Sequence, residues 1–229
     1  MKRPSARYQQ RLTQFIEQVT VYPVSCEKLA CGRSDEEWLE AVLAGGARIV
    51  QLRDKLSDDR TVYEKALLFR RKTAEAGALF IINNRVDIAL LAEADGVHLG
   101  NSDLPARAVR ELAPDLLIGV SANTKDQAAS ARERGASYYN IGPLFKTATK
   151  SGLLEFIGEK GISDYSGESD LPFTVMGGIK LEHVQRLTAL GASRIAVVTA
   201  LTRAEDIAEE TKRWIEAINR GKEAGRSGI

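Results

Sequence analysis

The feature of this 229-residue sequence that most constrains its fold is a regular alternation of short apolar runs with amphipathic segments. Apolar residues recur at helical spacing in segments such as 35–43, 86–91 and 184–190, which predicts helices there. The apolar runs between the helical segments predict eight short strands, at residues 20–25, 47–52, 79–82, 96–99, 117–120, 138–141, 173–176 and 194–198. Strands that alternate with helices indicate a parallel sheet built from βαβ units.

Eight such units in about 200 residues favour an α/β fold of the (β/α)₈ (TIM) barrel type. A doubly wound open sheet is the alternative, but eight even units suit closure of the sheet better. We expect residues 1–18 to form an N-terminal extension with an extra helix and residues 19–220 to form a single barrel domain. We further expect a surface loop at 161–172 and a flexible tail at 221–229, because both are rich in Gly and Ser.

The composition excludes several classes of protein. The net charge of +1 offers no electrostatic basis for binding nucleic acid, and no apolar run is long enough to span a membrane. The two cysteines, Cys26 and Cys31, have no matching Cys/His pair that would indicate a zinc site, so free thiols are expected. A cytoplasmic protein that acts on small molecules is therefore expected, and a homo-oligomer is left open.

Cationic and amide side chains follow the second predicted strand, where a barrel of this kind places its active site. Gln51, Arg53 and Lys55 alternate and therefore share one face. Arg and Lys in a barrel interior need an anion, and the shape of Arg suits bidentate contact with a phosphate. The alternative interpretation is a run of solvated loop charges.

Polar side chains also follow the third, fourth and fifth predicted strands. Asn83 and Asn84 could orient a substrate ring or simply cap the next helix. Asp103 could likewise cap a helix, or it could hold Mg²⁺ together with phosphate oxygens. Ser121 offers a hydroxyl for a phosphate, with capping as its alternative. His98 is equally consistent with a hydrogen-bonded core histidine.

A second group of candidate phosphate ligands follows the last three strands. The loop Gly142-Pro143-Leu144-Phe145-Lys146-Thr147-Ala148-Thr149-Lys150 carries two hydroxyls and a terminal lysine. Gly178 permits a close backbone approach to a ligand, and Thr199 begins the last such loop. The sequence thus predicts two anion sites, one with Gln51, Arg53, Lys55, Ser121 and Lys150, and the other with Thr147, Thr149, Gly178 and Thr199.

The motifs VQLRDK, INNRVDIALLAEADGVHLGNSDLP, IGVSANT, IGPLFKTATK, MGGI and AVVTAL resemble those of the thiamine phosphate synthase family, in order and spacing, over residues 47–201. The resemblance implies a transferase that joins hydroxymethylpyrimidine pyrophosphate to thiazole phosphate with release of pyrophosphate, and Mg²⁺ as cofactor. It implies pyrophosphate contacts from Arg53, Lys55, Ser121 and Lys150, together with Gln51, and a pyrimidine contact from Asn83. It further implies that Thr147, Thr149, Gly178 and Thr199 hold the thiazole phosphate, and that Asp103 and residue 84 bind the metal.

The sequence departs from the family pattern at several of these positions. Asn84 stands where the family usually has a metal-binding Asp, Lys146 stands where Pro is frequent, and Thr199 stands where Ser is frequent. The first strand lacks the usual acidic end, and residues 26–32 resemble an insert. Two alternatives follow: an isomerase similar to a thiazole tautomerase, which would need a histidine near Asn123, and a non-catalytic barrel that binds thiamine phosphates.

Overall fold

Eight parallel strands form one sheet in the computed structural model, which describes residues 5–147 and 156–227. The order of the strands around the sheet is β1-β8-β7-β6-β5-β4-β3-β2. The sheet closes through a parallel bridge between Val24 and Gln51, with a 2.9 Å hydrogen bond from the Ser25 amide to the Gln51 carbonyl. The strands are β1 (Val21–Pro23), β2 (Ile49–Leu52), β3 (Leu79–Asn83), β4 (Gly96–Leu99), β5 (Leu117–Ala122), β6 (Tyr138–Ile141), β7 (Phe173–Val175) and β8 (Ile195–Val197). The predicted (β/α)₈ barrel is confirmed.

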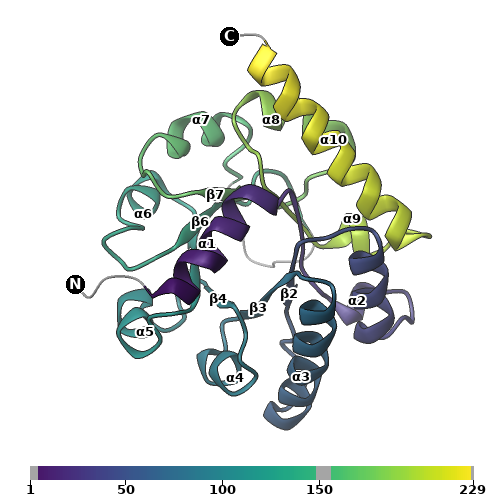
Figure 1. The fold of residues 1–229 in the computed structure, drawn as a ribbon. Helices are drawn as coiled ribbons and strands as arrows, with labels where there is room; N and C mark the ends of the chain where they lie inside the picture. The colour runs from purple at the N-terminus through teal and green to yellow at the C-terminus, as the bar shows by residue number, and fades with distance from the viewer. Residues whose placement is uncertain (1–4, 148–155, 228–229) are drawn as a thin grey trace.

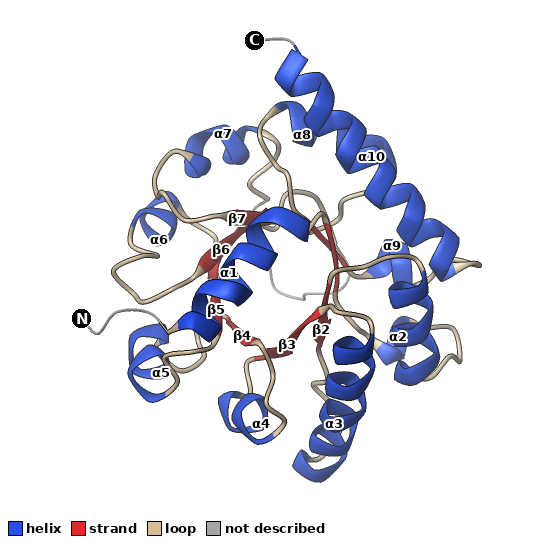
Figure 2. Cartoon of the chain, in the orientation of Figure 1, coloured by secondary structure: helices blue, strands red, loops and turns tan. Residues whose placement is uncertain are grey.

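Helices surround the strands on the outside of this ring, except for α1, which lies across its opening (Figure 2). Along the chain they are α1 (Ala6–Gln18), η1 (Glu27–Leu29), α2 (Asp35–Ala44), α3 (Asp59–Glu75), α4 (Val86–Leu91), α5 (Ala106–Leu112), α6 (Lys125–Ala129), α7 (Lys160–Ser166), η2 (Leu181–His183), α8 (Val184–Ala189), α9 (Thr199–Thr202) and α10 (Ile207–Ser227). Local sequence signals explain several of the starting points. Ser34 forms a capping box with Glu37 at α2, and the side chain of Asp58 caps α3.

Two expectations about the C-terminal half are wrong. Residues 161–166 of the expected surface loop belong to α7, in which Gly161 and Ile162 are buried. The expected tail beyond residue 220 continues as α10 through Ser227. Gly221 does not end that helix: a Cβ there would lie 2.0 Å from Oγ1 of Thr188, so this glycine permits close packing on α8.

The apolar side chains form two separate cores. The larger one lies between the sheet and the surrounding helices. The smaller one fills the inside of the barrel and includes Tyr22, Ile49, Leu79 and Tyr138. Gly119 makes room for this interior packing, because a Cβ there would lie 2.2 Å from Cζ of Tyr138.

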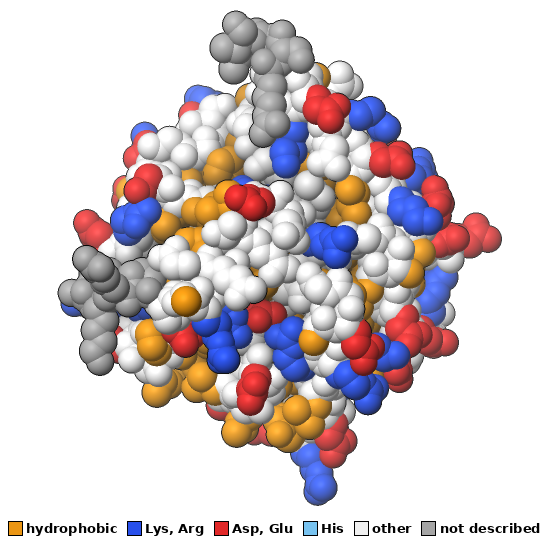
Figure 3. Space-filling view, in the orientation of Figure 1, with side chains coloured by type: hydrophobic (Ala, Val, Ile, Leu, Met, Phe, Trp, Pro, Cys, Tyr) orange, Lys and Arg blue, Asp and Glu red, His pale blue; other side chains and the backbone are white. Residues whose placement is uncertain are grey.

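Helix α1 closes one end of the barrel, and it lies across the barrel opening in Figure 1. Phe15 of α1 stacks on Tyr138 with 4.5 Å between the ring centroids, and the buried Arg194 donates to the Phe15 carbonyl oxygen at 3.0 Å. Arg11 pairs with Asp95, which directly precedes β4, so α1 covers the amino ends of the strands. Figure 3 shows this covered face, with side chains of both charges scattered around it. The carboxyl ends of the strands therefore remain for a ligand site.

We expect Gly119→Ala to lower the free energy of unfolding by about 1–3 kcal/mol, because overpacking a filled interior displaces side chains or backbone. Gly167→Ala is the matched control: a Cβ there meets nothing within 4 Å, and its φ of −82° suits alanine. It should leave stability unchanged or raise it by up to about 1 kcal/mol. Urea unfolding of both variants measures the difference, and equal stabilities would contradict the packing of Tyr138 against Gly119.

Candidate active site

A cavity of about 550 Å³ opens at the carboxyl ends of the strands, opposite α1. It draws its lining from every strand or the loop that follows it. Most of the site residues expected from the sequence line this cavity, namely Gln51, Arg53, Lys55, Asn83, Asp103, Ser121, Thr147, Gly178 and Thr199. Thr149 and Lys150 lie outside the described residues. The fold thus gathers residues that are up to about 150 positions apart in the sequence.

The register of the strands explains why polar side chains meet inside the barrel. Asn83 of β3 is the register partner of His98 of β4, and Ser121 of β5 is that of Asn140 of β6. Asn140 in turn pairs in register with Thr174 of β7. Side chains at equal height on neighbouring strands of a barrel form layers, so these residues give the cavity a polar floor.

Hydrogen bonds connect part of this floor into a chain. Asn83 Nδ2 donates to Gln51 Oε1 at 3.0 Å, and Gln51 Nε2 donates to the Tyr22 hydroxyl at 2.9 Å. The hydroxyls of Tyr22 and Tyr138 lie 3.0 Å apart, and the Tyr138 hydroxyl lies 3.5 Å from His98 Nδ1. His98 Nε2 lies 3.3 Å from Oγ of Ser121, the last member of the chain.

One direction of donation satisfies every member of this chain. Because Gln51 donates to Tyr22, the Tyr22 hydroxyl can donate to Tyr138, Tyr138 to His98 Nδ1, and His98 Nε2 to Ser121. Burial raises the pKa of both Tyr22 and Tyr138 well above the usual value, so both stay neutral and able to donate. This arrangement leaves the Ser121 hydroxyl hydrogen available for a ligand.

Several residues of the floor were not predicted from the sequence. Tyr22, Tyr138, Asn140 and Thr174 all line the cavity or join its hydrogen bonds, and Thr174 Oγ1 donates to Asn140 Oδ1 at 2.8 Å. A signal was present for Asn140, which is a polar residue within an otherwise apolar run. Tyr138 lies two positions before it and shares its face of the strand. His98, by contrast, is both a buried hydrogen-bonded histidine, as one interpretation expected, and a cavity residue.

The cationic side of the cavity follows β2. The Arg53 amide donates to the Ser25 hydroxyl at 3.0 Å, which ties the end of β2 to the end of β1. Arg53 is half-buried and Lys55 is exposed, and both side chains reach the cavity. A cationic wall of this kind attracts phosphate groups.

The loops after β6, β7 and β8 form the other side. The Phe145 amide donates to the Gly177 carbonyl oxygen at 2.9 Å, which binds two of these loops together. Gly178 has a φ of +64°, and a Cβ there would lie 2.4 Å from the Lys146 carbonyl oxygen, so glycine is required at this approach. Thr199 begins α9 and lines the cavity together with Thr147.

Asp103 and Asn84, the two residues expected to bind a metal ion, are in direct hydrogen-bond contact. Asn84 Nδ2 donates to Asp103 Oδ1 at 3.1 Å, and Asp103 Oδ2 accepts from the Gly100 amide at 2.7 Å. One carboxylate and one amide oxygen are few ligands for Mg²⁺, which commonly completes its shell with waters and substrate phosphates. The donor set therefore fits Mg²⁺ that arrives with a phosphorylated substrate.

Comparison with known proteins identifies relatives of the whole barrel. The family model described as thiamine monophosphate synthase matches residues 21–201. The thiamine-phosphate synthase of Pelotomaculum thermopropionicum is 38% identical over 201 residues, which cover 87% of this chain and 92% of that protein. The thiamine-phosphate synthase of Moorella thermoacetica is 38% identical over 203 residues, covering 88% and 97%.

Solved structures agree with the sequence relatives. Thiamine phosphate pyrophosphorylase from Pyrococcus furiosus superposes with a TM-score of 0.82 at 31% identity, covering 89% of this chain and 97% of that chain. A geranylgeranylglyceryl phosphate synthase from Thermoplasma acidophilum has a TM-score of 0.66 at 16% identity, covering 93% and 98%. The second similarity is one of fold alone.

We expect Asn84→Asp to make stability depend on Mg²⁺. The substitution replaces an amide donor with a second carboxylate beside Asp103, so without divalent ions the melting temperature should fall by about 2–4 °C, or about 1 kcal/mol. Addition of Mg²⁺ should restore it. Asn84→Ala is the control, because it also changes a residue with a φ of +54° but adds no charge. Equal responses of the two variants to Mg²⁺ in thermal unfolding would count against a metal at this pair.

Proposed function

Because the chain belongs to the thiamine monophosphate synthase family, we propose that it joins hydroxymethylpyrimidine pyrophosphate to thiazole phosphate, giving thiamine phosphate and pyrophosphate. The observation that carries this proposal is the division of the cavity. Cationic and amide groups follow β2 to β5 on one side, and hydroxyls and glycine backbone follow β6 to β8 on the other. Two phosphorylated substrates can bind there with their reacting atoms between them.

The reaction needs one bond to form and one to break. The lone pair of the thiazole ring nitrogen forms a bond to the methylene carbon of the pyrimidine, and the carbon–oxygen bond to pyrophosphate breaks, with its electron pair leaving on oxygen. No proton has to move in this step. Catalysis can then come from positioning and from stabilising the charge on the leaving group.

The side chains on the β2–β5 side have roles in this scheme. Arg53 and Lys55 neutralise the leaving pyrophosphate, and Ser121 donates its hydroxyl hydrogen to it. Asn83 orients the pyrimidine ring, and Gln51, which accepts a hydrogen bond from Asn83, is assigned to the pyrophosphate side together with Arg53 and Lys55. Asp103 and Asn84 would hold Mg²⁺, which would supply further positive charge beside the pyrophosphate. Lys150 is proposed for the same group by sequence alone.

The hydroxyls on the opposite side are proposed to hold the thiazole phosphate. Thr147 and Thr199 supply donors, and the glycine backbone at Gly178 allows the phosphate to approach closely. Thr149 is included from the sequence motif. These contacts do not change during the reaction, so they should affect binding of this substrate more than the chemical step.

The two alternatives make different demands. A tautomerase would need a base near the end of β5, where Asn123 donates its amide to the Gly142 carbonyl oxygen and accepts from Asn101. A non-catalytic barrel would bind thiamine phosphate without turnover. An assay of thiamine phosphate formation from the two substrates, with and without Mg²⁺, separates both alternatives from the synthase.

We expect Arg53→Ala to lower kcat/KM for thiamine phosphate formation at least ~10-fold, since a charge-assisted contact to the leaving group is worth about 1.4 kcal/mol or more. Arg48→Ala is the matched control at the other end of the same strand, where its guanidinium donates to the Ala76 carbonyl oxygen. The control should keep its rate. A wild-type rate in Arg53→Ala would remove this residue from the pyrophosphate site.

We expect Thr147→Val to raise the KM for thiazole phosphate about 10-fold, because the substitution keeps the shape and removes a donor to a charged group. The KM for the pyrimidine substrate should change little. Thr202→Val is the control, since this buried threonine bonds to the Val198 carbonyl oxygen and does not line the cavity. An effect confined to the pyrimidine substrate would exchange the two substrate sides.

A further inference from the structure

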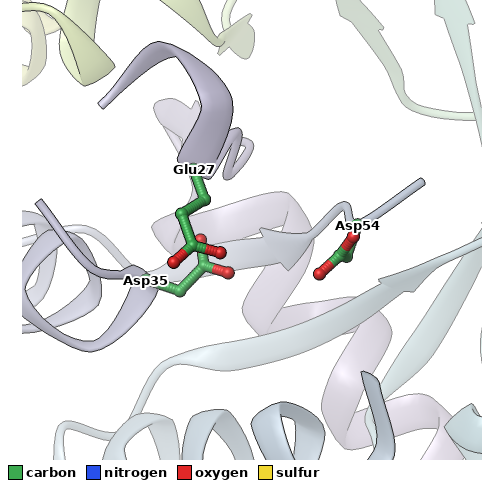
Figure 4. Close-up of side chains that lie close together, drawn as sticks. All are labelled: Glu27, Asp35 and Asp54. Atoms are coloured by element: carbon green, nitrogen blue, oxygen red, sulfur yellow. The ribbon is translucent and has the colours of Figure 1, made fainter. Parts of the chain in front are cut away.

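Three carboxylates converge beside the cationic side of the cavity, from three different segments. Glu27 belongs to η1, Asp35 begins α2 and Asp54 follows β2, and Figure 4 shows them facing one another. An oxygen of each lies within 4.8 Å of the others. Asp35 is 6% exposed. Three negative charges at this spacing, partly removed from water, repel one another unless a cation lies among them.

The cation is the ammonium group of Lys65, which comes from α3. Its Nζ lies 2.5 Å from Glu27 Oε2, 2.8 Å from Asp35 Oδ2 and 2.9 Å from Asp54 Oδ2. An ammonium has three hydrogens to donate, so these partners use all of them. The Lys65 side chain is 19% exposed, so water competes only partly for these contacts. In this group, which we call the Lys65 cluster (Glu27, Asp35, Asp54 and Lys65), the ammonium therefore occupies the place between the carboxylates that a metal ion would otherwise take.

The member of the cluster that bears on the site is Asp54. It stands between Arg53 and Lys55, which both line the cavity. Asp54 Oδ1 accepts from the amides of Leu56 and Ser57, each at 3.0 Å. Although partial burial opposes ionisation, these amides and Lys65 outweigh it and hold the pKa of Asp54 well below its usual range. The carboxylate thus fixes the backbone that carries both cationic side chains.

The cluster also binds this backbone to the segments around it. Through Lys65, the loop after β2 is linked to α3, to the start of α2 and to η1. Residues 26–32, which resemble an insert in the sequence, are thereby linked to the loop beside the cavity, because Glu27 and Asp54 both accept from Lys65. Four segments would have to separate for the loop to shift away from the cavity.

We propose that Lys65 is a positioning residue, which acts through Asp54 to hold Arg53 and Lys55 in the geometry that binds pyrophosphate. The proposal rests on the proposed function for its substrate. Lys65 does not line the cavity, so it acts without touching the ligand. A cationic pair held in place before binding loses less conformational entropy when the anion arrives, which strengthens binding.

Lys65→Met, with Lys72→Met as the matched control, tests this proposal. Lys72 is also on α3, its side chain is 23% exposed, and it pairs with Glu36 at 3.6 Å and with Glu40, both on α2. Of these two lysines, Lys65 pairs with Asp54 and Lys72 does not. In Lys65→Met we expect the Kd of inorganic pyrophosphate, measured by calorimetry, and the KM of the pyrimidine substrate to rise about 10-fold. The KM of thiazole phosphate should stay within about 2-fold, and Lys72→Met should change none of the three.

Two further measurements separate positioning from a general loss of structure. Lys65→Arg keeps the charge and should recover most of the pyrophosphate affinity. Hydrogen exchange at the amides of Leu56 and Ser57 should become faster in Lys65→Met than in Lys72→Met. Wild-type pyrophosphate affinity in Lys65→Met would overturn the proposal. So would equal losses in the two methionine variants.

A variant at Asp54 keeps the test decisive if Lys65→Met does not fold. Asp54→Asn keeps an oxygen for the amides of Leu56 and Ser57 but loses the charge that faces Lys65, and it should also weaken pyrophosphate binding. Wild-type affinity in this variant would overturn the proposal. If the wild-type protein neither forms thiamine phosphate nor binds pyrophosphate, the proposed function fails, and the exchange of the Leu56 and Ser57 amides still decides whether Lys65 holds the loop.

Discussion

Closure of the sheet between β1 and β2 is the interaction on which the site depends. The amide of Ser25 donates to the carbonyl oxygen of Gln51, and the Ser25 hydroxyl accepts from the amide of Arg53. These bonds join the first strand to the second and turn an open parallel sheet into a ring. In an open sheet, the residues after β2 and those after β6 would lie far apart; in the closed ring they face each other across one cavity.

The closed ring has an interior that must be filled, and this chain fills its two ends differently. Toward the amino ends, Phe15 of α1 and Tyr138 stack and exclude water. Toward the carboxyl ends, amides and hydroxyls replace the apolar side chains. The phenol of Tyr138 joins the two regions, because its ring packs in the apolar part while its hydroxyl takes part in the hydrogen bonds below the cavity. An interior polar group is tolerated only when it has partners, and the chain from Asn83 to Ser121 supplies them.

Acidic residues beside the cavity meet two different kinds of partner. In the Lys65 cluster, three carboxylates surround an ammonium and hold a loop, and the cationic side chains of that loop are left to face the cavity. At Asp103, a single carboxylate faces an amide, so no second negative charge opposes an anionic substrate. The number of carboxylates alone does not show whether a cluster suits a metal ion. The nearest partner does, because an ammonium that donates to all three carboxylates reduces their repulsion and occupies the place that a metal ion would otherwise take.

The sequence alone determined the fold and most of the candidate site. Eight apolar runs with helices between them indicate a parallel sheet that is covered on both faces, and eight even units favour its closure; the polar residues just after those runs then converge at one end. It could not show that Gly221 lies within a helix or that residues 160–166 form one, because the buried contacts at Gly221 and Ile162 are with distant segments. It also could not pair Lys65 with Asp54, or Tyr22 with Tyr138, since such pairs depend on which side chains meet after the chain has closed. Periodicity along a chain determines which residues turn inward, whereas partners across the barrel depend on the register and closure of the sheet, which are properties of the tertiary structure.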